Sequence, residues 1–87
     1  MDRTYKVFGS GRLNGVDVVC FSDESSARAF ASMMTRLDWE VWELTGERAG
    51  YSGCEGFSLE IHRSTNENHT EFERLAVYQK GEQRWKP

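Results

Sequence analysis

Two cysteines and two histidines are the residues of this sequence that best combine metal-binding with nucleophilic or acid–base chemistry: Cys20, Cys54, His62 and His69. Four such ligands would suffice for structural zinc, but zinc sites usually carry two closely spaced ligand pairs, and none is present. A Cys54 thiolate with a histidine base would be a nucleophilic pair, yet Cys54 lies among glycines that do not fix its position. We therefore predict no metal, no cofactor and no catalytic residue, and we expect a protein that is not an enzyme.

The segment GSGRLNG (residues 9–15) resembles a phosphate-binding loop. Asn14 stands where the dinucleotide-binding pattern requires its third glycine. A predicted strand follows the segment, so no helix N-terminus is offered to an anion. We interpret it as a hairpin loop.

A cluster of acidic and aromatic residues begins at DWEVWEL (residues 38–44), where a glutamate follows each of two tryptophans. Four acids and one base lie between Asp38 and Arg48. Aromatic side chains supply buried anchor area and carboxylates steer association, so this surface would suit a basic groove on another protein. The predicted partner-binding residues are Trp39, Glu40, Glu43, Glu47, Tyr51 and Glu55.

A small basic cluster lies near the C-terminus, where Trp85 stands between Arg84 and Lys86. The tryptophan ring can stack on a base and the two cations can bind phosphates. These three residues therefore form an alternative site for single-stranded nucleic acid. The formal net charge of −3 disfavours this alternative, because non-specific phosphate binders carry a basic excess.

Length and composition predict one compact domain over residues 1–87, with 38% apolar and 29% charged residues. The sequence starts without an apolar leader and contains no apolar run near eighteen residues. We therefore expect a cytoplasmic protein with reduced thiols that does not cross a membrane. Cys20 is expected to be a small core residue.

The first half of the chain predicts a hairpin, over residues 4–8 and 16–21, followed by a helix. Ser22 or Asp23 can cap the helix. Its apolar stripe, at steps of three and four, would contain Ala27, Phe30, Met34 and Leu37. The opposite side, expected to face water, would contain Arg28, Ser32, Thr35 and Arg36.

Residues 38–44 admit two interpretations. The stripe continues through Val41 and Leu44, which is consistent with one helix over residues 23–45. The β-branched and aromatic residues of this segment favour a separate strand, and we adopt the strand. In a strand the two indoles point to opposite faces. Trp42 and Leu44 would pack inward and Trp39 would lie outside, beside Glu43.

The second half predicts one alternating strand over residues 57–63 and a closing hairpin around Lys80 and Gly81, with Leu75 and Val77 inward. The expected fold is α+β, in the order β-β-α-β-β-β. One amphipathic helix packs on one face of a four- to six-stranded, mainly antiparallel sheet. The uncovered face would carry Lys6, Glu60 and a solvated His62, with some of Phe8, Phe21, Arg74 and Tyr78.

This order of elements, with the helix start DESSARAFA (residues 23–31) and the ending LAVYQKGEQRW (residues 75–85), is similar to that of certain phage anti-CRISPR proteins. The resemblance implies a non-enzymatic inhibitor that blocks a host defence complex by steric occlusion. It carries over no functional residue, because neither stretch contains a site motif.

These observations favour a small binding protein that occludes a surface of a larger host protein or ribonucleoprotein in the bacterial cytoplasm. The first alternative is a nucleic-acid-binding accessory domain. The second is a self-associating protein, such as a homodimer, because an exposed edge strand can pair with its own copy.

Overall fold

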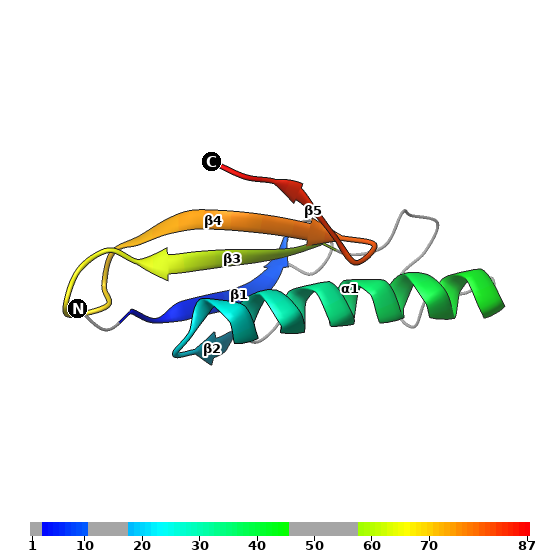
Figure 1. Ribbon diagram of the computed structural model, residues 1–87, viewed down its shortest axis with the longest axis horizontal. Helices are drawn as coiled ribbons and strands as arrows, with labels where there is room; N and C mark the ends of the chain where they lie inside the picture. Colours follow the sequence, from blue (N-terminus) through cyan, green and yellow to red (C-terminus); the bar gives the residue numbers. More distant parts are fainter. Residues whose placement is uncertain (1–2, 11–17, 46–57) are drawn as a thin grey trace.

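The computed structural model describes residues 3–10, 18–45 and 58–87, which form one helix and five strands (Figure 1). In chain order these are β1 (Tyr5–Ser10), β2 (Val19–Phe21), α1 (Glu24–Thr45), β3 (Ser58–Ser64), β4 (Phe72–Gln79) and β5 (Glu82–Trp85). The strands form one antiparallel sheet in the order β2-β1-β3-β4-β5, and α1 lies along one face. The predicted α+β class and the order β-β-α-β-β-β are confirmed.

The core lies between α1 and the three central strands. Val7, Ile61 and Ala76 face one another across β1, β3 and β4, and all three are almost completely buried. Tyr5, Leu59, Leu75 and Tyr78 extend this layer, and Phe21, Phe30 and Met34 pack against its edge. Alternation along each strand sends the intervening side chains to the other face.

An irregularity in β4 decides which of its residues join the core. The pairing shifts between Ile61 and His62, so Leu75 is an extra residue opposite β3. Leu75 and Ala76 are both buried, while Val77 pairs with Trp85 on the face away from the helix. The prediction for Leu75 is confirmed and that for Val77 is wrong, because a bulge breaks the two-residue period.

α1 is a single helix of 22 residues, so the predicted strand over residues 38–44 is wrong. The helix begins with Asp23, whose Oδ2 accepts a hydrogen bond from the Ser26 amide at 2.9 Å. Once such a helix has started, each added residue gains a hydrogen bond, and this outweighs weak strand propensities. The alternative of one helix through residue 45 is confirmed.

The side of the helix that faces the sheet matches the predicted stripe only in part: Ala27 is buried as predicted, but Leu37 is not. Ala27, Ala31 and Thr35 are buried against the sheet, whereas Leu37 is 51% exposed. The small alanines let α1 approach strands that already carry two tyrosines, and close-packed interiors require matched volumes. Phe30 and Met34, the other members of the predicted stripe, pack at the edge of the core.

The side of α1 predicted to face water contacts the β4–β5 hairpin. The Ser32 hydroxyl donates to the Gly81 carbonyl at 2.8 Å, and the Gly81 amide donates to the Thr35 hydroxyl at 3.0 Å. Arg28 donates to the Tyr78 hydroxyl at 3.2 Å and to the Gln83 side chain at 2.9 Å. Its hydrogen bond to Glu24 raises the pKa of Arg28 above its ordinary value. Three polar residues of α1 thus hold the hairpin against the helix through hydrogen bonds.

Candidate functional site

The C-terminal end of α1 carries the described part of the predicted partner-binding surface. Glu40 and Glu43 are exposed on the last turns, and Figure 1 shows the helix continuing past the end of the sheet. At about 1.5 Å per residue, 22 residues span about 33 Å, whereas the seven residues of β3 span about 24 Å. Glu47, Tyr51 and Glu55 lie outside the described residues.

The charges at this end oppose the helix dipole. The C-terminus of a helix carries a partial negative charge that favours cations, yet the last turn of α1 contains no basic residue. Glu40 lies 3.9 Å from Arg36, and both side chains are about 60% exposed, so the pair is weak. The surface at this end is therefore acidic at a cost to helix stability, and such local conflicts are typical of functional sites.

An exposed apolar stripe lies beside the acids. Met33, Leu37, Val41 and Leu44 follow one another at steps of four, four and three, which places them on one side of the helix. They are 53%, 51%, 39% and 86% exposed. Glu40 is one turn from both Leu37 and Leu44, so carboxylate and apolar groups adjoin. We call Leu37, Glu40, Val41, Glu43 and Leu44 the helix-end surface.

None of the apolar residues of the helix-end surface was predicted as a site residue. Leu37 was predicted to lie in the core and Leu44 to lie in a strand, and both predictions are wrong. The usable signal was length, because a helix continuous to residue 45 must extend beyond a sheet built from strands of about seven residues.

Trp39, predicted to lie on the outer face of a strand, instead joins α1 to the hairpin. It is half-buried, and the Lys80 ammonium lies 4.0 Å from the centre of its ring. A cation at this distance from an indole is attracted to the ring. Trp39 therefore contributes to packing at the base of the helix-end surface. The prediction that Trp39 lies on the outer face of a strand is wrong, because this segment is helical, whereas its role in binding a partner stays a prediction.

The sheet face away from α1 forms the second candidate surface. One row across the strands contains Phe8, Glu60, Val77 and Trp85, and the next contains Lys6, His62 and Arg74. The predictions for Lys6, Glu60, His62, Phe8 and Arg74 are therefore confirmed. Phe21 and Tyr78 are exceptions: Phe21 packs 5.3 Å from the ring of Phe30, and Tyr78 is in the core.

Side chains on this open face contact one another. His62 Nε2 lies 2.9 Å from Glu60 Oε1, and its ring lies 4.6 Å from that of Phe8. Lys6 lies 3.8 Å from the centre of the Phe72 ring. The expectation of a solvated His62 is wrong, because its side chain is only 24% exposed. Many side chains of this face thus have partners on the same face, both within β3 and across strands.

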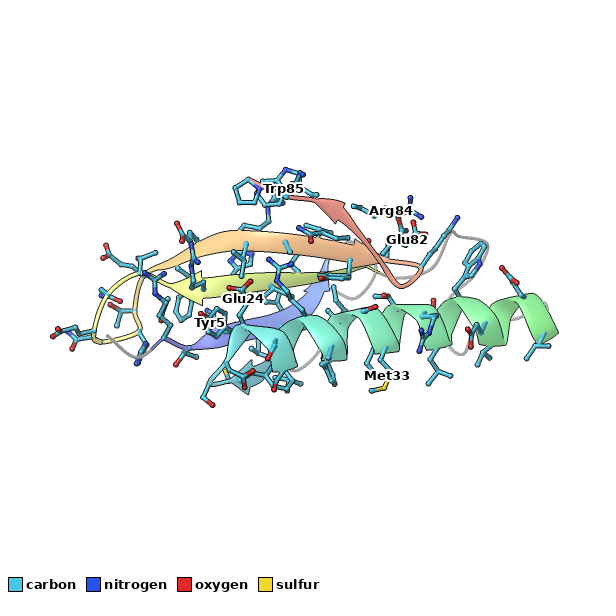
Figure 2. The ribbon with its side chains drawn as sticks, in the orientation of Figure 1. Tyr5, Glu24, Met33, Glu82, Arg84 and Trp85 are labelled. Atoms are coloured by element: carbon cyan, nitrogen blue, oxygen red, sulfur yellow. The ribbon has the colours of Figure 1, made fainter. Side chains whose placement is uncertain are left out.

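Trp85, at the edge of the open face, belongs to the predicted alternative site. The Arg74 guanidinium lies 4.2 Å from the centre of its ring and 3.8 Å from Glu60. A shallow hollow of about 250 Å³ is lined by Gln83, Arg84, Trp85 and Lys86. Figure 2 shows Trp85 on the side of the sheet away from α1. The alternative site residues Arg84, Trp85 and Lys86 therefore lie together.

Cys20 does not occupy the core position that was predicted. It is exposed on edge strand β2, opposite Lys6. Cys54 lies outside the described residues. In the described ranges, no three histidine, cysteine or acidic side chains are grouped as metal ligands. α1 is too polar for a membrane-spanning segment, and the described part of the chain contains no other helix.

One serine–histidine pair lies at the distance expected for a nucleophile and its base, but the serine is not accessible to a substrate. His69 Nδ1 lies 3.0 Å from Ser64 Oγ. Ser64 is fully buried, and its Oγ accepts a hydrogen bond from the Thr4 amide at 2.8 Å. A buried hydroxyl cannot reach a substrate, so this contact serves to hold the β3–β4 loop against the start of β1.

Comparison with protein-family models, with curated proteins and with solved structures finds no match to this chain.

Proposed function

We propose that this domain is a non-catalytic binding protein that docks the helix-end surface into a groove on a larger protein and occludes it. The observation that carries the proposal is the exposure of Leu37, Val41 and Leu44 on one side of a helix end that also presents Glu40 and Glu43. An amphipathic helix that extends from its own domain can place such a stripe in a partner's groove.

The chemistry of the surface defines the partner. Leu44, at 86% exposure, is the best anchor, because burying a leucine side chain contributes about 1.5–3 kcal/mol. The carboxylates of Glu40 and Glu43 and the negative end of the helix dipole favour basic groups at the rim of the groove. We infer an apolar groove bordered by lysine or arginine side chains.

The resemblance to phage anti-CRISPR proteins supplies the specific form of the proposal. Proteins that handle nucleic acid have basic grooves, because these grooves bind phosphates. An acidic helix end that occupies such a groove would exclude the nucleic acid. The proposed partner is therefore a nucleic-acid-handling protein or ribonucleoprotein of a bacterial host, and the proposed site of action is its cytoplasm.

The test is a pull-down from bacterial lysate, before and after nuclease, with three forms of the tagged protein. The first is the wild type and the second is Glu40→Lys with Glu43→Lys. The third, a matched control, is Glu67→Lys with Glu71→Lys, which changes charge equally at exposed positions of the β3–β4 loop. The proposal predicts one stoichiometric protein partner, resistant to nuclease, retained by the wild type and the control but lost by the helix variant.

A thermal melt separates loss of binding from loss of fold. Lysine is favoured over glutamate at a helix C-terminus, so the helix variant should melt at or slightly above the wild-type temperature. Equal capture by all three forms would refute the helix-end surface. Partners that disappear with nuclease would favour the nucleic-acid alternative, and capture of the same chain alone would favour self-association.

A further inference from the structure

The open face of the sheet ends at the edge strand β5, where Trp85 lies on the side away from α1 (Figure 2). We propose that Arg84, Trp85 and Lys86 bind single-stranded nucleic acid, with one base stacked on Trp85 and its phosphates held by the two cations. This site is separate from the helix-end surface and does not depend on the function proposed for it.

Trp85 is held in place by contacts with neighbouring strands. Its ring is paired with the Arg74 guanidinium at 4.2 Å, and Arg74 in turn lies 3.8 Å from Glu60. Trp85 is also in register with Val77, on the row that begins at Phe8. These contacts fix the indole on the sheet before any ligand arrives, which lowers the entropy lost on binding.

A small hollow lies beside the indole. The hollow lined by Gln83, Arg84, Trp85 and Lys86 measures about 250 Å³, below the roughly 300–1,000 Å³ typical of drug-sized ligand sites. It therefore suits one planar ring rather than a large ligand. Trp85 is 36% exposed, so indole surface remains for stacking. Stacking on an indole accepts any base, because every base has a π-face.

Two cationic side chains lie beside the hollow. Arg84 and Lys86 flank Trp85 in sequence and line the same hollow. Arg84 lies 3.5 Å from Glu82, but the Glu82 side chain is 72% exposed, so this pair is weak in water and a phosphate can replace it. A ring between two cations is complementary to a base attached to phosphates. The acidic side chains of the helix-end surface belong to a different element, so the net charge of −3 does not describe this site.

The experiment follows the three indole N–H signals of the intact chain by NMR during titration with a short oligodeoxythymidylate. Trp85→Phe identifies the Trp85 signal by its loss. The expected result is a shift of that signal, with saturable binding that weakens as salt rises. Two phosphates neutralised on a single strand give a slope of log K against log salt of about −1.4. Trp85→Ala should weaken binding on the order of tenfold or more.

Matched variants distinguish the effect of the two cations at the hollow from the effect of net charge. Arg84→Gln with Lys86→Gln should remove most of the salt dependence. Arg3→Gln with Arg36→Gln makes the same change in net charge at residues that do not line the hollow and should leave binding unchanged. Equal loss in both variants would overturn the site in favour of general charge attraction.

Two further ligands test the identity of the occupant. Thymidine monophosphate should bind more weakly than the oligonucleotide, because it contacts fewer groups; equal affinity would overturn the assignment to a strand. Inorganic polyphosphate should bind without moving the Trp85 signal. An unmoved Trp85 signal with the oligonucleotide would overturn the stacking step and with it the proposal.

Discussion

The Gly81 amide donates a hydrogen bond to the Thr35 hydroxyl at 3.0 Å, across 46 residues of sequence. The same hydroxyl donates to the Ala31 carbonyl at 2.8 Å, so Thr35 links the β4–β5 turn to the helix backbone while itself almost completely buried. This contact fixes the hairpin that carries Trp85 against the helix that carries the helix-end surface.

We expect Gly81→Ala to destabilise the domain. Gly81 has a φ of 81°, and an added Cβ would lie 2.8 Å from the Cβ of Arg36. Both the backbone conformation and the contact penalise a side chain, and each such effect costs about 1 kcal/mol or more. Chemical denaturation should show a loss of about 2 kcal/mol in the free energy of unfolding. Glu82→Ala, at the exposed neighbouring position, is the control and should change it by less than about 0.5 kcal/mol.

Thr35→Val should also destabilise the domain, although it nearly preserves volume. It leaves the Gly81 amide without its partner, and an unsatisfied buried amide costs about 1–3 kcal/mol. Thr35→Ser retains the hydroxyl and should recover part of that loss. Urea denaturation of the two variants provides the measurement. A valine variant as stable as the wild type would show that the hydroxyl contributes nothing.

A pair of helix variants tests which side of α1 faces the sheet. Met34 packs against the core, whereas Leu37 is 51% exposed. Met34→Ala should therefore lower the free energy of unfolding by about 1–2 kcal/mol, less than the roughly 2–5 kcal/mol for a fully buried methionine, because Met34 is half-buried. Leu37→Ala should stay within about 0.5 kcal/mol of the wild type. Similar losses in both variants would instead support the stripe predicted from sequence.

Asp23 should make stability depend on pH in the acid range. Hydrogen bonds from the Ser25 hydroxyl and the Ser26 amide hold the pKa of Asp23 below its ordinary 3.8. A lowered folded-state pKa stabilises the fold above pH 3.8, and this contribution disappears as the pH falls through the folded value.

Asp23→Asn isolates this effect, because asparagine also caps helices but does not titrate. Thermal melts of the wild type and the variant should converge as the pH is lowered below 3.8. A constant difference between the two melting temperatures across that range would contradict the assignment.

The sequence by itself determined the elements with a strong local signal. Alternation predicted a strand over residues 57–63, close to the observed β3 (Ser58–Ser64). The turn at Lys80 and Gly81 predicted the last hairpin, and the cap at Asp23 predicted the start of the helix. It also placed Glu40 and Glu43 among candidate site residues and brought Arg84, Trp85 and Lys86 together, because both clusters are local in sequence.

Tertiary structure alone decided the rotation and extent of α1. Apolar residues at steps of three and four predicted a stripe from Ala27 to Leu37, yet after Ala27 the fold buries Ala31 and Thr35 and leaves Leu37 exposed. The reason is volume: the bulge in β4 brings Leu75 and Ala76 together into a core that already contains two tyrosines, and only small side chains let the helix approach. Leu37, Val41 and Leu44, at the C-terminal end of the stripe, are exposed because the strands are shorter than α1. Neither cause can be read from the periodicity of the helix alone.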